Sequence, residues 1–131
     1  MTNITLTSPP DVTPAATYEH VAVANGFAFL AGQVARDADG QWVGLGDPGA
    51  QARQVYKNIG RILAHIGARP DQVVKVLTFS TDRAHGAAIS EARLAFFGDH
   101  RPPHSGILIN GLGSPEVLVE VEVVVALDSG Q

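Results

Sequence analysis

The amino-acid sequence predicts a single α+β domain in which two helices cover one face of a mixed β-sheet. Three observations support this fold class. Residues 117–127 alternate valine with other side chains, which is the period of a strand whose valine face packs on a core. Asn25-Gly26 joins two short apolar runs, and this pair favours a hairpin because both turn positions take positive φ. Residues 47–67 and 85–99 carry apolar side chains at helical spacing.

Size and charge restrict the functions open to the chain. Its 131 residues suffice for one hydrophobic core and not for two. The formal net charge of −4 and the dispersed lysines and arginines argue against a protein that binds nucleic acid or a membrane surface by charge. The absence of cysteine excludes disulfides, a thiolate nucleophile and thiolate metal ligands. No apolar run approaches the ~18 residues of a transmembrane helix and no segment resembles a signal peptide, so we expect a cytoplasmic protein.

The first third of the chain is expected to supply an arm and a hairpin. Residues 1–16 contain three prolines and favour an extended N-terminal arm. Residues 20–24 and 27–34 are the two strands of the hairpin. A turn-rich segment, 37–46, then leads into the first helix.

The first helix has clear ends. Asp47 can cap it, Pro48 suits its first turn, and Gly67 fits its C-terminal stop. Its inward stripe is expected to contain Val55, Ile59, Ile62, Leu63 and Ile66. Its opposite face is expected to be exposed to solvent and to contain Gln51, Arg53, Lys57 and Arg61.

The second half continues the alternation of strands and helices. Residues 73–81 predict a strand and residues 85–99 a helix, with Ile89, Ala92 and Phe96 on its inner stripe. Strands at 105–110 and 117–127 complete the order ββαβαββ. Two helices leave the other face of the sheet uncovered, and an apolar uncovered face has to be covered by other chains. The sequence therefore predicts an oligomer.

Two carboxylates on the last strand are the first candidate for a functional site. Glu120 and Glu122 share the strand face opposite the valines, among apolar neighbours. A carboxylate removed from water must be hydrogen-bonded, paired or protonated. Two interpretations stay open: both glutamates are solvated on an exposed sheet face, or one of them lines a pocket.

Other candidates are weaker when taken alone. Gly32-Gln33 ends the hairpin, where glycine allows close approach of the backbone. His104 follows two prolines just before a strand, and a loop histidine without chemistry is the simpler interpretation. The five histidines form no recognised metal-binding motif, and neither a GxSxG motif nor a phosphate-binding glycine loop is present. We expect no metal and no cofactor.

Several segments together resemble one family. Tyr18, AVANGFAFLAGQV, QARQVYKNIGRIL, VVKVLTFSTD, EARLAFF, PPHS and PEVLVEVEVVVA occur in the order and at the spacing found in the Rid family, which is also called YjgF-like or L-PSP endoribonuclease. The resemblance covers nearly the whole chain. It implies a chorismate-mutase-like α+β fold over residues 1–131 and a homotrimer with ligand clefts between subunits.

The resemblance also implies a site. Family members that deaminate small 2-imino acids use a glutamate that activates water, a tyrosine and an arginine that holds the substrate carboxylate. The matching positions here are Glu120, Tyr18 and His104. Further positions of the family fall at Ala31, where the family has a hydroxyl group, and at Ser90 and Gly106. Gly32, Gln33 and Ile107 are expected to complete the substrate-binding residues. The backbone amides near Gly32 and Ile107 are expected to stabilise developing negative charge.

One position departs from the family pattern. An arginine binds a carboxylate through two parallel hydrogen bonds and stays charged, whereas histidine offers single donors and is mostly neutral near pH 7. His104 therefore argues against standard deamination of 2-iminopropanoate and 2-iminobutanoate and favours a less acidic ligand. Arg101 lies nearby, but Pro102-Pro103 makes a substitute role awkward.

Three functions remain open from the sequence. The first is an enzyme that adds water to a small imine, enamine or carbonyl compound, with Glu120 handling the proton. The second is a trimer that binds a small molecule without turning it over. The third is a ribonuclease, against which the acidic net charge and the lack of a basic groove both argue.

Overall fold

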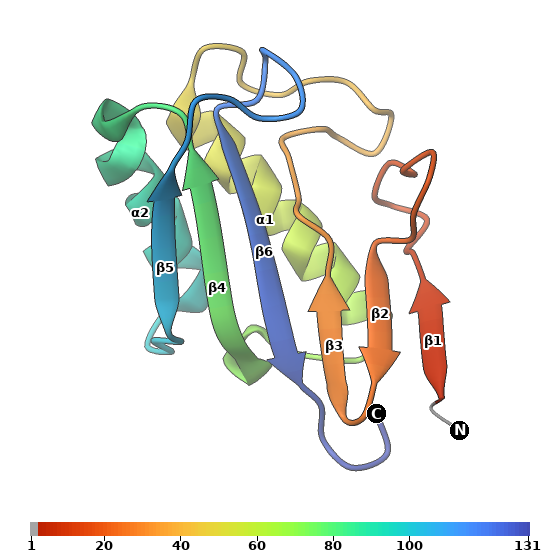
Figure 1. Ribbon diagram of the computed structural model, residues 1–131. Coiled ribbons are helices and arrows are strands. Elements are labelled where there is room, and N and C mark those ends of the chain that lie inside the picture. Colours follow the sequence, from red (N-terminus) through yellow and green to blue (C-terminus); the bar gives the residue numbers. More distant parts are fainter. Residues whose placement is uncertain (1–2) are drawn as a thin grey trace.

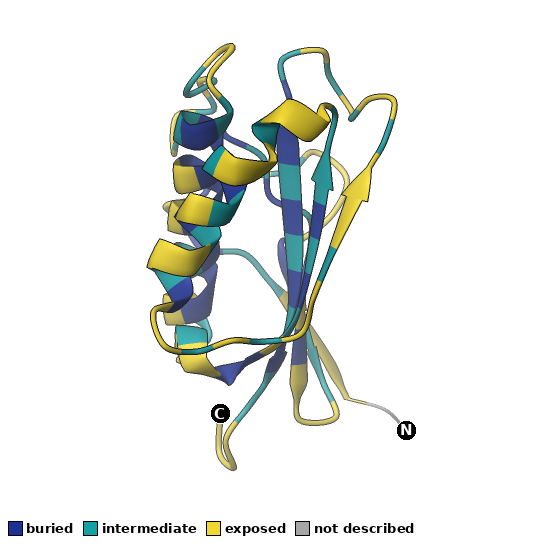
Figure 2. Cartoon of the chain, turned by 90° about the vertical axis from the view of Figure 1, so that its left-hand side faces the viewer, coloured by how far each residue is buried: buried dark blue, intermediate teal, exposed yellow. Residues whose placement is uncertain are grey.

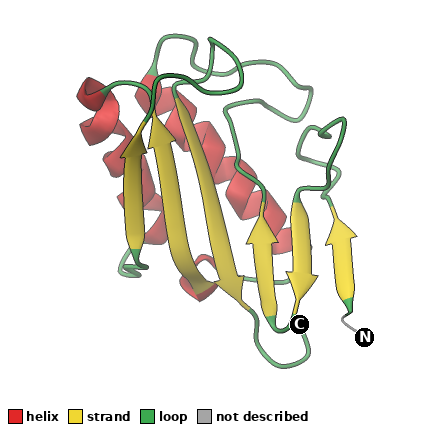
Figure 3. Cartoon of the chain, in the orientation of Figure 1, coloured by secondary structure: helices red, strands yellow, loops and turns green. Residues whose placement is uncertain are grey.

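A six-stranded sheet with the order β1-β2-β3-β6-β4-β5 carries the fold (Figure 1). The computed structural model describes residues 3–131. The strands are β1 (Ile4–Thr7), β2 (Val21–Ala24), β3 (Phe27–Leu30), β4 (Val73–Ser80), β5 (His104–Leu108) and β6 (Val119–Ala126). The helices are α1 (Pro48–His65) and α2 (Gly86–Phe97), with short 3₁₀ turns at Pro70–Gln72 and Arg83–His85. Figure 3 shows both helices on one face of the sheet, as predicted.

Strand β6 is the centre of the sheet. It pairs antiparallel with β3 on one side and with β4 on the other, and β4 pairs parallel with β5. The predicted valine face is confirmed, because all four valines at odd positions of β6 are buried against the helices: Val119, Val121, Val123 and Val125. Burial of a valine side chain contributes about 1.5–3 kcal/mol, so this face fixes which side of β6 points inward.

The predicted hairpin joins β2 to β3. Asn25 has φ 54° and Gly26 has φ 81°, so both turn positions occupy the left-handed region. Ala24 therefore lies opposite Phe27, and the two-residue connection sets the register of the whole hairpin.

The N-terminal arm is only partly as predicted. Residues 4–7 form β1, which pairs antiparallel with β2 from Ile4 opposite Ala24 to Thr7 opposite Val21. The order is therefore βββαβαββ. The short segment gives little periodic signal by itself, and its strand conformation comes from pairing with β2. Residues 1 and 2 of the predicted arm lie outside the described residues.

Helix α1 begins as predicted. Asp47 is its N-cap, with Oδ1 accepting a hydrogen bond from the Ala50 amide at 3.0 Å, and Pro48 lies in the first turn. Gly67 follows the helix with φ 71°. The predicted inward residues are buried except Ile66, which is half-buried.

Gln51 is not on the exposed face of α1. Its side chain is 1% exposed. Its Nε2 donates to the carbonyls of Gly44 at 3.1 Å and Glu116 at 2.9 Å, and its Oε1 accepts from the Leu118 amide at 3.0 Å. Gln51 precedes Val55 by four residues and so belongs to the inward stripe. The prediction of a solvated glutamine was wrong because the amide finds all its partners in two loops.

Helix α2 packs on α1 as well as on the sheet. Phe97 is buried, whereas the predicted inward residue Phe96 is half-buried. The Phe96 ring lies 5.0 Å from the Tyr56 ring of α1. The Phe97 ring also packs edge-on against Tyr56, with ring centroids 5.8 Å apart, so both phenylalanines contact α1 and only Phe97 is fully in the core.

The other face of the sheet has no helix over it. Figure 2 shows both helices stacked on one side of the strands. Apolar side chains remain exposed on the strands, and they include Ile4, Leu6, Phe27, Phe29 and Ile107. Half-buried Leu77, Glu122 and Val124 lie in register with them across the same face. We call this surface the open face.

No helix of the described residues is long and apolar enough to cross a membrane.

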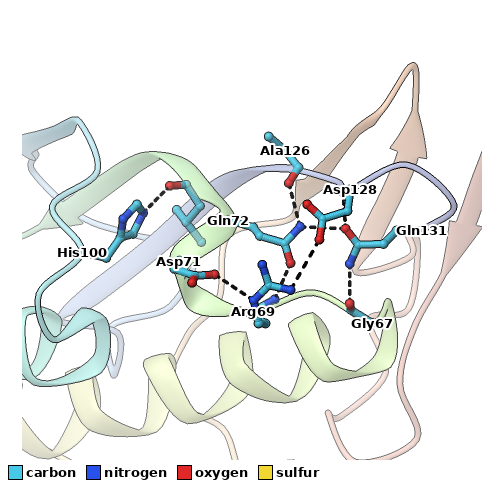
Figure 4. A network of polar contacts seen from close by, with 9 residues as sticks. Gly67, Arg69, Asp71, Gln72, His100, Ala126, Asp128 and Gln131 are labelled. Carbon is cyan, nitrogen blue, oxygen red and sulfur yellow. Dashed lines mark hydrogen bonds and ion pairs between the residues drawn. The ribbon is translucent and has the colours of Figure 1, made fainter.

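A polar network holds the end of β6 against the start of β4 (Figure 4). Gln72 donates to the Ala126 carbonyl at 3.0 Å. Arg69 contacts Asp71 at 3.1 Å and Asp128 at 3.4 Å, and all three side chains are exposed. Exposed ion pairs contribute little stability, so we assign the register at this end mainly to the half-buried amide bond of Gln72.

We predict that Gln51→Leu lowers the free energy of unfolding by about 2–4 kcal/mol. The substitution leaves one amide and two carbonyl groups without partners where burial denies them water. Urea unfolding would measure the loss. Arg53→Leu is the matched control on the exposed face of α1 and should change stability by no more than about 0.5 kcal/mol. Equal midpoints for Gln51→Leu and the unmodified chain would contradict the structural role.

Candidate functional site

All predicted site residues except Ala31 line one of two hollows, which share no lining residue. The first, the Glu120 hollow, has a volume of about 280 Å³, and its walls include Tyr18, Gly32, Gln33 and Glu120. The second, the His104 hollow, has a volume of about 220 Å³, and its walls include Ser90, His104, Gly106 and Ile107. Ala31 lines neither hollow. The single chain therefore brings these predicted residues together in two groups and not in one.

Glu120 is a half-buried carboxylate without a partner. Among residues 3–131 no side chain forms an ion pair with it and no donor lies within hydrogen-bonding distance. Burial raises the pKa of Glu120 above its ordinary value, and the neighbouring charge of Glu122 raises it further. Of the two earlier interpretations, the structure supports the pocket for Glu120. Glu122 lines a different depression on the open face, with Phe29 and Leu77.

Gly32 leaves room for this carboxylate. A Cβ atom at position 32 would lie 2.5 Å from Glu120 Oε2 and 2.7 Å from Cδ, closer than van der Waals contact allows. The amides of the two neighbouring residues are already bonded, Ala31 to the His20 carbonyl at 2.9 Å and Gln33 to the Val121 carbonyl at 2.8 Å. The predicted close approach of backbone and site therefore occurs at Gly32.

Gln33 is buried and held by His20. Its Nε2 lies 3.0 Å from His20 Nδ1 and donates to the Ala31 carbonyl at 3.1 Å. On the other side of the ring, His20 Nε2 lies 2.8 Å from the Thr13 carbonyl. A carbonyl only accepts, so Nε2 carries the proton and Nδ1 accepts from Gln33. This chain of bonds fixes the floor of the Glu120 hollow.

Tyr18 lies at the mouth of the same hollow. Its side chain is 57% exposed, and its ring meets His20 edge-on with centroids 6.2 Å apart. The exposed side chain is free to contact a ligand, while its ring packs against an imidazole that hydrogen bonds hold in place.

Sequence reasoning missed several residues that shape the Glu120 hollow. Asn58 lies on the buried side of α1 and donates to the carbonyls of Val34 at 3.2 Å and Arg36 at 2.9 Å. Arg36 stacks on Trp42, 4.3 Å from the ring centroid, at the hollow's wall. Asn58 follows Val55 by three residues, so a polar side chain within an apolar stripe was the available signal.

His104 points to the helix side of the sheet. Its Nε2 lies 3.0 Å from Thr78 Oγ1 on β4. Burial lowers the pKa of His104, and the positive charges of Arg93 and Lys75 lower it further. The imidazole is therefore neutral near pH 7 and carries no charge for binding an anion.

Two arginines lie in the His104 hollow. Arg93, on α2, is half-buried, and Arg83, in the turn before α2, is exposed. Ser90 precedes Arg93 by three residues, so the two share a helix face. Arg101 does not line the hollow. It donates instead to the backbone carbonyls of Gly98 and His100.

Comparisons with known proteins agree with this architecture. The sequence pattern of the family described as Endoribonuclease L-PSP matches residues 9–127. A RutC family protein of Synechocystis is 32% identical over 115 residues, which is 87% of this chain and 88% of the relative.

Solved structures give the same result. The crystal structure of the yeast protein YEO7 superposes with a TM-score of 0.90 at 29% identity, over 96% of this chain and all of that one. YyfA of Yersinia pestis, a protein of the conserved Rid family, superposes with a TM-score of 0.90 at 26% identity, over 95% of this chain and all of that one. The chain therefore belongs to the endoribonuclease L-PSP family, the Rid or YjgF-like family that its sequence resembles.

Proposed function

We propose that this protein adds water to a small imine, and thereby releases ammonia, in clefts between the subunits of a homotrimer. Related enamine and carbonyl compounds are substrates of the same chemical class. The observation that carries the proposal is the Glu120 carboxylate, half-buried without a partner, with its pKa raised, and set directly on the Gly32 backbone beside Tyr18.

The chemistry requires one group that accepts a proton and returns it. Water attacks the carbon of the protonated imine while Glu120 takes one proton of the water, which gives a neutral carbinolamine. Glu120 then returns that proton to nitrogen. As the C–N bond breaks and ammonia leaves, the hydroxyl oxygen becomes the carbonyl oxygen and gives its proton to Glu120, which releases it to solvent. A carboxylate with a raised pKa is a stronger base than an ordinary one, which suits the first step. The Tyr18 phenol can donate a hydrogen bond to the reacting group.

The trimer is supported by two features of the single subunit. The open face exposes large apolar side chains, including Phe27, Phe29 and Ile107, which favours cover by another protein surface. The Glu120 and His104 hollows are separate within one chain, so a cleft between neighbouring subunits would bring the two groups of residues together. The resemblance to the Rid family implies this assembly.

Non-catalytic binding of a small molecule is the second candidate. Position 31 carries alanine where the family has a hydroxyl, and residue 104 carries no charge. A chain that has lost these groups can retain a binding cleft without turnover. We do not propose ribonuclease activity, because the net charge is −4 and neither hollow is a long basic groove.

Ammonia release from freshly generated 2-iminopropanoate and a panel of other small imines tests the proposal. We expect the unmodified protein to accelerate at least one of them and Glu120→Gln to lose at least about 100-fold, as expected for loss of a general base. Glu122→Gln is the control, since Glu122 lies outside the Glu120 hollow. Turnover that survives in Glu120→Gln would exclude the assigned mechanism, and silence of the unmodified protein on the whole panel would favour the binding protein.

Glu120→Gln should also make the protein more stable at neutral pH. A carboxyl group whose pKa is raised by folding binds a proton more readily in the folded state than in the unfolded state. The stability that this group contributes is therefore complete below pH 4.5, the ordinary pKa, and is lost as the pH rises through the raised pKa of the folded protein. The glutamine of the variant does not titrate, so the variant does not lose stability in this pH range. We expect a higher thermal midpoint than the unmodified chain at pH 7 and no difference at pH 4. A lower midpoint at pH 7 would show that the charged form is stabilised in the assembly.

Gly32→Ala should impair turnover with little loss of fold. The new methyl group occupies the space of the Glu120 carboxylate, and the flexible glutamate has to rotate away. We expect a fall in kcat of at least about tenfold, since small displacements of a catalytic group are costly. Circular dichroism should be unchanged. Gly111→Ala is the control, because a Cβ atom at position 111 meets no atom within 4 Å and Gly111 lines neither hollow. Full activity in Gly32→Ala would contradict the steric role of Gly32.

A further inference from the structure

We propose that Arg93, with Arg83 beside it, binds the anionic group of the substrate in the His104 hollow, so that this protein selects carboxylate-bearing substrates although residue 104 is histidine. The inference rests on the proposed function, because it assigns the substrate class of the same cleft. It replaces the expectation, drawn from His104 alone, of a less acidic ligand.

Position supports the assignment first. Residues of both β5 and α2 line the His104 hollow, and α2 lies behind β5 in Figure 1. Arg93 and Ser90 enter it from one face of α2, and Arg83 enters from the turn that precedes the helix. His104, Thr78 and Ser80 form the strand side. Two arginines and three residues with hydroxyl groups thus line a space of about 220 Å³.

Neither guanidinium is used within the subunit. Within the described residues, 3–131, the ion pairs involve Arg61 and Arg69, and neither Arg83 nor Arg93 donates a hydrogen bond to a protein group. An exposed arginine without a partner is common. Arg93 differs because it is half-buried and lies in a hollow. A half-buried arginine without a protein partner favours an anion from outside the chain.

Arg93 and His104 both line the hollow, and the charge of Arg93 lowers the pKa of His104, after burial. His104 stays neutral beside it and can act as a hydrogen-bond donor or acceptor to the ligand, with Nε2 already at Thr78.

Arg101 is closer to His104 in sequence than Arg93 is, but it does not reach the hollow. Arg101 is exposed and bonded to backbone carbonyls of Gly98 and His100. It lies outside the hollow, and Pro102-Pro103 limits its approach. Arg93 reaches the hollow from a helix, where packing holds its backbone.

Comparing the binding of a charged ligand with the binding of its neutral isostere tests the inference without turnover. Pyruvate is a stable carbonyl analogue of 2-iminopropanoate, and pyruvamide replaces its carboxylate by a neutral amide of the same shape. Titration calorimetry on the full-length protein should show pyruvate bound at least about tenfold more tightly than pyruvamide. Arg93→Met should weaken pyruvate by about 10- to 100-fold and leave pyruvamide within about twofold. Arg93→Lys should lie between, because lysine keeps the charge but not the fork.

Arg53→Met is the matched control, since it removes an exposed arginine of α1 that lines neither hollow. It should leave both ligands unaffected. If Arg93→Met fails to fold, Arg83→Met and Arg93→Lys decide, and each should weaken pyruvate selectively. Equal affinity for pyruvate and pyruvamide, no binding of pyruvate at tens of millimolar, or pyruvate binding unchanged in the Arg93 variants would each overturn the inference. Selective pyruvate binding in a protein that releases no ammonia would instead refute the proposed reaction and leave the anion site standing.

Discussion

The structure depends on the strict alternation of β6. Its valines fill the space between sheet and helices, and its glutamates consequently project from the other face. A shift of one residue in register would place Glu120 in the core and a valine in the hollow. The antiparallel ladder with β4, from Ser80 opposite Val119 to Val73 opposite Val125, prevents that shift. The same hydrophobic burial that stabilises the domain therefore also sets the position of its reactive carboxylate.

The sequence predicted the elements whose signals are local. The Asn25-Gly26 turn, the Asp47 cap and the valine face of β6 each follow from a few adjacent residues, and all three are present. It failed where a partner distant in sequence decides the outcome. Residues 4–7 become a strand through pairing with β2, and Gln51 is buried because loops at 44 and 116–118 satisfy its amide.

The site shows the same division between local and distant information. Glu120 and Gly32 were candidates from the sequence pattern and Tyr18 from the family resemblance, and all three line one hollow. The buried support from His20 and Asn58 was not foreseen, because neither residue is close in sequence to the groups it orients. Arg93 was also missed. The sequence shows it only as one polar residue of α2, and its relation to His104 appears once residues of β5 and α2 line one hollow.

The contact between Gly32 and Glu120 also restricts the order in which this site can change in evolution. While glutamate occupies position 120, any side chain at position 32 meets it, so substitutions of the glycine are selected against. Replacement of Glu120 by a smaller residue removes that obstacle, and position 32 is then free to vary. Relatives that have lost the carboxylate should therefore have lost the glycine later, and the two positions should vary together across the family.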